Sequence, residues 1–155
     1  MNSELQDMRL VSACLLGIKC AWDGKDRYKN KKVIELLKNE ILIPVCPEQL
    51  GGLKTPRVFQ EIQKGTGDDV LDGRSRVKNK VGEDVTRQFI KGAKQALKIA
   101  KQYGIKEFIA KSKSPSCGCG LIYDGSFFGK LIKGDGVTVA LFKRNAIKVI
   151  TENDI

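Results

Sequence analysis

DVTRQFIKGAKQALKIAKQYGIKEFIA, residues 84–110, contains the clearest helix of the chain and a helix-to-strand transition. Apolar residues recur at helical spacing over Val85–Ala100, and Gly104 is the type of residue that ends a helix. The apolar run Ile105–Ala110 follows at once, so the sequence predicts a helix before Gly104 and a buried strand after it. A long helix that leads directly into such a strand is typical of α/β proteins.

The rest of the chain contains three more apolar runs of strand length and two more helical patterns. The strands are predicted at Met8–Leu16, Ile41–Cys46 and Ile147–Ile150, and the helices at 31–39, capped by Asn30, and after Asp135. Helices between strands imply right-handed crossovers and a mainly parallel sheet. We therefore expect one domain over residues 1–155, a three-layer α/β sandwich with a Rossmann-like sheet. In such folds the active site lies at the carboxyl ends of the strands.

Composition limits the class of protein. The 155 residues suit one domain with its own core, and no apolar run is long enough to span a bilayer. The N-terminal segment 1–7 is polar and acidic, unlike a signal peptide, so we expect a cytoplasmic protein.

The net charge of +10 fits either a solvated lysine-rich surface or attraction of an anionic ligand, a nucleotide or RNA. No arginine-rich tail supports the RNA interpretation.

Histidine is absent from the chain, and this excludes several kinds of site. A Ser-His-Asp triad, a Cys-His pair and every metal site that needs imidazole are ruled out. Proton transfer must therefore use Glu, Asp, Lys, Tyr or Cys. Any metal must be held by thiolates, carboxylates or backbone groups.

The five cysteines do not form the pattern of a disulfide framework or a zinc ribbon, because their number is odd and no Cys-x-x-Cys occurs. Cys14, Cys46 and Cys117 map to the same edge of the predicted sheet. One such cysteine is usually a small buried apolar residue, whereas three thiols without histidine suggest a soft metal or an iron–sulfur cluster. Three ligands on a four-iron cluster leave one iron open as a Lewis acid. Cys119 is an alternative ligand, and Cys20 is interpreted as a bystander.

Glu48 lies two residues after Cys46 and has two interpretations. It can stabilise the first turn of a short helix that begins at Pro47. It can also act as a general acid or base beside a metal, and the lack of histidine favours this second role.

Four other polar residues near the predicted edge also have a structural and a functional interpretation. Ser114 and Ser116 can bond the backbone of the Ser-Pro-Ser-Cys turn or orient a substrate carbonyl or water. Asp23 can stabilise its Trp-Asp-Gly turn or bind substrate. Lys113 is either a surface charge or a group that attracts an anionic ligand.

Several long motifs of this chain resemble those of the DUF523 or TudS family, and they follow the family's order. They are Val11–Gly17 with Trp22–Gly24, Pro44–Gly52, Thr55–Arg57, Lys113–Gly118 and Gly134–Thr138. The resemblance covers the whole chain, and the characterised members of the family are thiouracil desulfurases.

The resemblance implies a 4Fe–4S cluster held by three cysteines, here Cys14, Cys46 and Cys117, with one open iron. It implies that Glu48 is catalytic and that Ser114 assists. The implied reaction replaces the thiocarbonyl sulfur of a thiolated pyrimidine by oxygen without redox chemistry and releases hydrosulfide. The substrate is then a thiolated base such as thiouracil, a nucleoside or a nucleotide, with thiolated tRNA as a further alternative. Candidate substrate-binding residues are Ser12, Asp23, Lys113 and Ser116.

Two other classes of function remain open at this point. One is a non-catalytic iron–sulfur or persulfide carrier, which would need the cysteines but not Glu48. The other is an RNA-binding protein that depends on the charge of +10 and binds tRNA with a steep dependence on salt.

Overall fold

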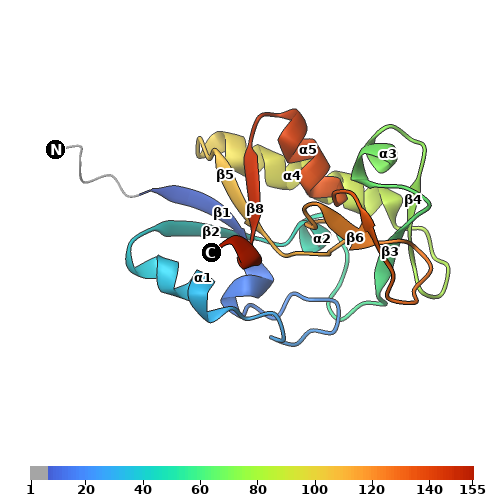
Figure 1. The fold of residues 1–155 in the computed structure, drawn as a ribbon, viewed down its shortest axis with the longest axis horizontal. Helices are drawn as coiled ribbons and strands as arrows, with labels where there is room; N and C mark the ends of the chain where they lie inside the picture. Colours follow the sequence, from blue (N-terminus) through green and yellow to red (C-terminus); the bar gives the residue numbers. More distant parts are fainter. Residues whose placement is uncertain (1–6) are drawn as a thin grey trace.

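The centre of the protein is a four-stranded sheet in a computed structural model that describes residues 7–155 (Figure 1). Its strands are β1 (Met8–Ser12), β2 (Ile41–Val45), β5 (Glu107–Ala110) and β8 (Lys148–Thr151). The spatial order is β2-β1-β5-β8, and each neighbouring pair is parallel. The predicted α/β class with a mainly parallel sheet is therefore confirmed. Residues 1–6, most of the segment compared with signal peptides, lie outside the described residues.

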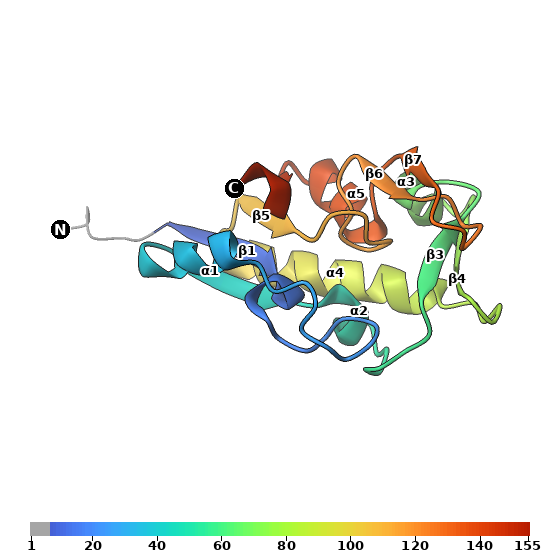
Figure 2. The ribbon, with the colours of Figure 1, turned by 60° about the horizontal axis from the view of Figure 1, so that its bottom comes forward.

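Helices cover both faces of this sheet because its central strands are apolar on both sides. Leu10 and Phe108 pack into one core, and their neighbours Val11 and Ile109 pack into another. The first core is closed by α4 (Thr86–Gln102) and α5 (Val137–Arg144), and the second by the 3-10 helix η2 (Ala13–Leu16) and by α1 (Lys31–Glu35), which η3 (Leu36–Lys38) extends. Figures 1 and 2 show α1 on the side of the sheet away from α4 and α5. This is the predicted three-layer arrangement.

Most predicted elements are present, with two corrections at their ends. The first strand stops at Ser12 instead of Leu16, because the chain tightens into a 3-10 turn that Gly17 closes at φ +85°. Asp135 does not cap the last helix: the N-cap is Gly136, and one Asp135 carboxylate oxygen accepts the N–H of Gly120. The predicted cap of α1 is confirmed, since the Asn30 side chain accepts the N–H of the third helical residue.

A second, smaller unit forms where the sequence predicts mostly loops. It contains the antiparallel pair β3 (Gln60–Gln63) and β4 (Arg76–Asn79), the helix α3 (Gly67–Leu71) and the hairpin β6 (Leu121–Tyr123) and β7 (Leu131–Lys133). The loop predicted at 65–69 and the turn predicted at 70–73 are wrong, since α3 begins in the first and ends in the second. Thr66 and Asp69 form a capping box that stabilises this short helix. A separate core with Ile62, Phe89 and Ile122 at its centre packs the unit onto α4.

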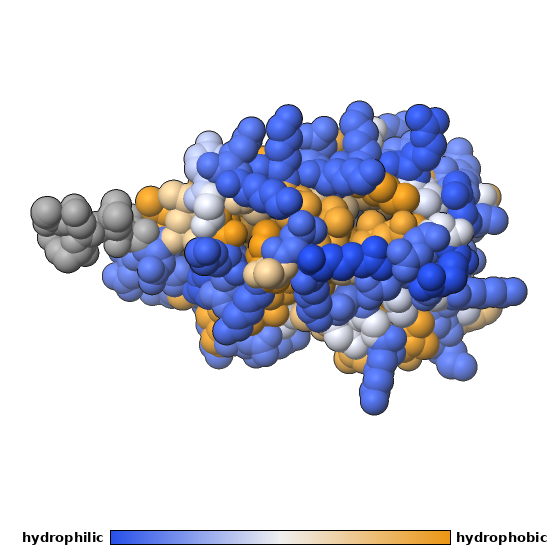
Figure 3. Space-filling model, turned by 90° about the horizontal axis from the view of Figure 1, so that it is seen from above, coloured by the Kyte–Doolittle hydropathy of each residue, from blue (hydrophilic) through white to orange (hydrophobic). Residues whose placement is uncertain are grey.

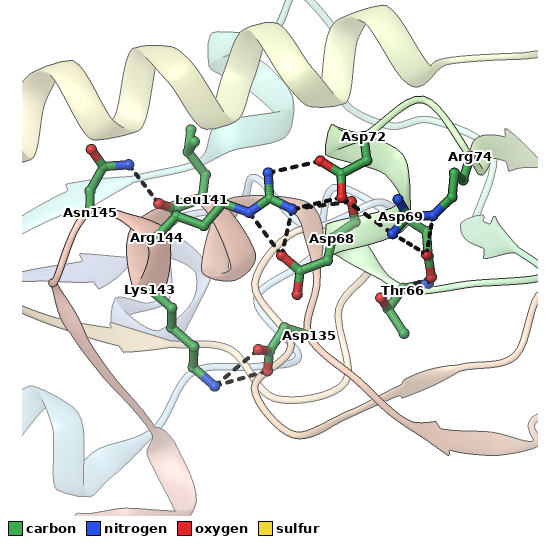
Figure 4. Close-up of polar contacts among 10 residues, drawn as sticks. All are labelled: Thr66, Asp68, Asp69, Asp72, Arg74, Asp135, Leu141, Lys143, Arg144 and Asn145. Atoms are coloured by element: carbon green, nitrogen blue, oxygen red, sulfur yellow. Dashed lines mark hydrogen bonds and ion pairs between the residues drawn. The ribbon is translucent and has the colours of Figure 1, made fainter.

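Ion pairs join this unit to the C-terminal helix (Figure 4). Arg144 on α5 contacts the carboxylates of Asp68 and Asp72, and Arg74 contacts those of Asp69 and Asp72. Each exposed pair adds little stability alone, but together they bridge segments that are far apart in sequence.

The surface is rich in charge, in keeping with the composition. Figure 3 shows hydrophilic side chains over most of one face, with apolar atoms visible between them. Within residues 7–155, no helix has the length and apolar character that crossing a bilayer requires.

Candidate active site

A cavity of about 300 Å³ lies at the carboxyl ends of β1, β2 and β5. Cys14 reaches it from η2, Cys46 from the end of β2, and Cys117 from the loop after β5. All five cysteines of the chain are free thiols. The prediction that these three cysteines share one edge of the sheet is therefore confirmed.

The short helix α2 (Pro47–Leu50) presents Glu48 to this cavity. Pro47 begins the helix as predicted, and Cys46 is its N-cap. The helix packs very closely on α4, because a Cβ at Gly92 would lie 1.8 Å from the Pro47 carbonyl oxygen. This contact fixes the direction from which the Glu48 side chain enters. One carboxylate oxygen of Glu48 lies 3.8 Å from the Cys46 sulfur.

The Cys117 loop is held by its own serine. Ser114 Oγ accepts the backbone N–H groups of Ser116 and Cys117 at 3.1 and 3.0 Å. The Ser114 carbonyl oxygen accepts the N–H of Gly118 at 2.7 Å. Ser114 also lines the cavity, so the turn-stabilising role is present and a substrate-facing position is available as well.

The start of α5 holds the same loop from outside. The N–H groups of Gly136, Val137 and Thr138 donate to carbonyl oxygens of Gly118, Pro115 and Ser116 at 2.8–2.9 Å. The hydroxyls of Thr138 and Ser116 are also hydrogen-bonded, at 2.8 Å. The Gly134–Thr138 motif of the sequence therefore acts as a clamp on the cysteine loop.

Gly136→Ala is expected to loosen this clamp. A Cβ at Gly136 would lie 2.5 Å from the Ser116 carbonyl carbon and oxygen, and backbone atoms cannot move away at low cost. Overpacking of this kind costs about 1–3 kcal/mol, so the Tm should fall by several degrees. Gly73→Ala serves as a comparison for backbone strain alone, because Gly73 is left-handed at φ +79°, unlike the extended Gly136, and its new methyl group meets nothing within 4 Å. A Gly136→Ala variant with the Tm of the unmodified protein in calorimetry would contradict the clamp.

The cavity disfavours free thiolates. Burial is the largest cause that raises the pKa of Cys14 and of Cys117, and the charge of Glu48 raises both further. Hydrogen bonding with Cys20 is the largest cause that raises the pKa of Cys46, followed by burial and by Glu48. These thiols are therefore protonated at neutral pH, and a metal that binds them would have to displace their protons.

The donor set fits an iron–sulfur cluster better than a single ion. Across residues 7–155, no group of three or more Cys, Asp or Glu side chains has the geometry of a site for one metal ion. Instead, the three thiols are spread around a cavity of about 300 Å³. Soft thiolates without imidazole are the ligands of iron–sulfur clusters, in which separate irons each bind one cysteine. Cys14, Cys46 and Cys117, with Cys20 as a fourth cysteine of the same wall, are therefore the residues able to hold such a group.

Three aromatic side chains form part of the cavity wall. Trp22 and Phe59 meet edge to face with ring centres 5.4 Å apart, and Phe59 and Tyr123 do so at 6.0 Å. They come from the loop after η2, the segment before β3 and the strand β6. Aromatic walls are suited to flat heterocyclic rings, which stack on them.

Of the predicted substrate-binding residues, the structure brings two to the cavity and places two elsewhere. Ser12 and Lys113 line it, and Lys113 is exposed with a left-handed backbone at φ +68°. Asp23 is not among the lining residues and pairs with Arg27. Ser116 is also outside the lining, because it is buried against α5.

The structure places one of the two remaining cysteines in the cavity wall and the other outside it. Cys20, interpreted as a bystander, is buried in the cavity wall, and its carbonyl oxygen lies 3.7 Å from the Cys46 sulfur. Cys119, considered as an alternative ligand, is not a lining residue, and its sulfur lies 3.9 Å from the carbonyl oxygen of Val149.

Sequence reasoning missed several charged and aromatic residues of the wall, namely Tyr28, Arg57, Phe59, Lys111 and Tyr123. Lys111 donates to the Ser112 carbonyl oxygen at 2.7 Å and lies 4.5 Å from the ring centre of Tyr28. Arg57 also lines the cavity, and its Nη2 lies 3.9 Å from a carboxylate oxygen of Glu48. The only signal for Arg57 was its place in the Thr55–Arg57 motif.

Comparisons with known proteins point in one direction. The model of the 2-thiouracil desulfurase family matches residues 10–154. A relative from Bacillus subtilis (strain 168), the uncharacterized protein YbbK, is 45% identical over 148 residues, which cover 96% of this chain and 97% of the relative. The solved structure of TudS, a 4Fe–4S-dependent thiouracil desulfidase, matches with a TM-score of 0.84 and 36% identity. That match covers 97% of this chain and 93% of the TudS chain.

Proposed function

This chain belongs to the 2-thiouracil desulfurase family, and on that basis we propose that it is a 4Fe–4S-dependent desulfurase acting on a thiolated pyrimidine. The observation that carries the proposal is the meeting of three thiols and the Glu48 carboxylate in one cavity. The reaction is the replacement of a thiocarbonyl sulfur by oxygen from water. The carbon keeps its oxidation state, so no nicotinamide or flavin is needed.

In this proposal Cys14, Cys46 and Cys117 hold the cluster and leave one iron without a protein ligand. When bound, the cluster supplies a Lewis acid that attracts the substrate sulfur and polarises the carbon–sulfur bond. The protein supplies everything else: the orientation of the ring, the handling of protons and the exclusion of bulk water.

Glu48 is the proposed general acid and base. Its carboxylate takes a proton from the water that attacks the ring carbon, or moves one to the ring nitrogen. The carbon–oxygen bond forms, the carbon–sulfur bond breaks, and the protons of the water end on the released sulfide and in solution.

Ser114 is the proposed hydrogen-bond donor to the substrate. A serine oxygen has two lone pairs, and Ser114 Oγ already accepts two backbone N–H groups. Its O–H is therefore free to donate into the cavity toward a ring oxygen or nitrogen. The wall of Trp22, Phe59 and Tyr123 offers a surface on which the pyrimidine stacks.

The cavity size supports a small-molecule substrate. A volume of about 300 Å³ is at the lower end of ordinary small-molecule sites, and part of it must contain the cluster. A free base, nucleoside or nucleotide fits this description better than thiolated tRNA. Lys113 is exposed where it lines the cavity, and an anionic substituent of the substrate would meet its ammonium group there.

Anaerobic reconstitution with iron and sulfide tests the function. The product should contain about four irons per chain and convert 2- or 4-thiouracil, or their nucleosides and nucleotides, with loss of thiocarbonyl absorbance and release of one sulfide per turnover. Cluster-free protein is the control and should be inactive. A complete cluster that converts none of these compounds would contradict the proposal and favour a non-catalytic carrier.

A further inference from the structure

Arg57 has an unusual environment for a charged residue. Its side chain is only 7% exposed, and it lines the cavity beside Glu48. A buried guanidinium is costly unless each of its donors finds a partner. The partners of Arg57 therefore indicate why the charge is there.

Most donors of Arg57 are accounted for by nearby loops. Nη1 donates to Thr55 Oγ1 at 3.0 Å and contacts the Lys54 carbonyl oxygen at 3.4 Å. Nη2 donates to the Cys20 carbonyl oxygen at 3.1 Å. These bonds hold the guanidinium plane in one orientation, and they come from neutral groups that do not balance its charge.

The charge of Arg57 is balanced by Glu48. Its Nη2 lies 3.9 Å from Glu48 Oε2, a distance at which the groups attract each other without a direct hydrogen bond. Within residues 7–155, this is the one ion pair that Glu48 makes. Arg57 Nε is the single buried side-chain nitrogen or oxygen of this region without a hydrogen-bond partner. Burial of this incompletely bonded cation indicates a functional constraint.

Glu48 needs such a partner because of its other neighbours. Its Oε1 lies 3.8 Å from the Cys46 sulfur, and its charge acts on Cys14 and Cys117 as well. Once these thiols become thiolates, they repel the carboxylate. A fixed cation on the far carboxylate oxygen opposes this repulsion and keeps the side chain in the cavity.

We propose that Arg57 is a positioning residue that holds Glu48 in its working orientation beside the three cysteines. This role rests on the proposed desulfurase function. Arg57 acts through Glu48 and not on the substrate itself. A purely structural role, in which Arg57 only ties together the loops at Cys20 and Thr55, is the alternative.

A double-mutant cycle on the reconstituted protein separates the two roles. The variants are Arg57→Met, Glu48→Gln and both together, with Arg76→Met as a matched control because Arg76 pairs with Asp84 on the surface. Arg57→Met should lower kcat at least about tenfold and change KM less than about twofold. In the Glu48→Gln background, the same substitution should change kcat less than about twofold, because its target is already gone. The control should behave as the unmodified protein.

Two readouts are independent of turnover. Iron per chain should be the same in Arg57→Met as in the unmodified protein. Trp22 is the sole tryptophan and lines the cavity, so quenching of its fluorescence by uracil measures product binding, which should also be unchanged. Arg57→Lys keeps the charge and should recover part of the lost kcat.

The outcomes are distinguishable. If the kcat losses of the two single variants multiply in the double variant, Arg57 and Glu48 act independently, and this would contradict the positioning role. A loss of iron from Arg57→Met in proportion to its loss of activity would also contradict it. If one of these two results is found while the unmodified protein converts its substrate, only the role of Arg57 is contradicted and the desulfurase function stands. An unmodified protein with a full cluster and no turnover would overturn both that function and the role of Arg57.

Discussion

Replacing Cys14, Cys46 or Cys117 by serine is expected to remove most of the iron that the reconstituted protein binds. A serine hydroxyl does not replace a thiolate as a ligand for iron in a cluster. Loss of one of three ligands should lower iron content at least about tenfold, since even indirect changes around a metal cost about 10–100-fold in affinity. Iron and sulfide per chain, measured with visible absorption after anaerobic reconstitution, check this expectation. Desulfuration should be lost in parallel.

Cys119→Ser is the matched control for this series. Cys119 lies two residues from Cys117 in the same loop, but it is outside the cavity lining and its sulfur contacts the carbonyl oxygen of Val149. The variant should keep its iron and its activity. Loss of iron in Cys119→Ser together with normal iron in Cys117→Ser would assign the third ligand to Cys119 instead.

Glu48→Gln is expected to abolish turnover and leave the cluster in place. Glutamine has nearly the shape of glutamate but does not take up or release the proton that the reaction moves. The loss of general acid–base catalysis should lower kcat by about 10²–10⁴-fold. Iron content should be unchanged, because the proposed ligands are the three cysteines. Steady-state rates with a thiouracil and an iron determination on the same sample measure both effects.

Glu35→Gln provides the comparison for this variant, because Glu35 forms an exposed ion pair with Lys38 away from the cavity lining. Its rate should equal that of the unmodified protein. An iron–sulfur carrier without catalysis would show no dependence on Glu48. Rates for Glu48→Gln within about twofold of the unmodified protein would thus exclude the proposed proton transfer.

The amino-acid sequence was sufficient for the features that depend on neighbouring residues. The spacing of apolar side chains predicts α4, which spans Thr86–Gln102, and the four strands of the parallel sheet. Asn30 and Pro47 begin helices, as their chemistry predicts. The absence of histidine and the position of three cysteines after strands lead to a thiolate site at one edge of the sheet. These inferences hold because helix capping and side-chain periodicity depend on residues that are close in sequence.

The tertiary structure was needed wherever a residue's role depends on a distant partner. Asp135 looks like a helix cap in sequence, but folding brings the N–H of Gly120 to its carboxylate. Asp23 and Ser116 belong to recognisable motifs, but neither lines the cavity. The Asp23 carboxylate pairs with Arg27, and the Ser116 hydroxyl is hydrogen-bonded to that of Thr138.

The same applies to the cavity wall and to its charges. Phe59 and Tyr123 become neighbours only because the small unit folds back over the ends of the parallel strands. Arg57 meets Glu48 and the Cys20 carbonyl oxygen through loops that sequence patterns do not place relative to one another. Local chemistry therefore determined which residue types reach the sheet edge. Long-range packing decided which of them face the cavity, because a contact between distant segments depends on every element between them.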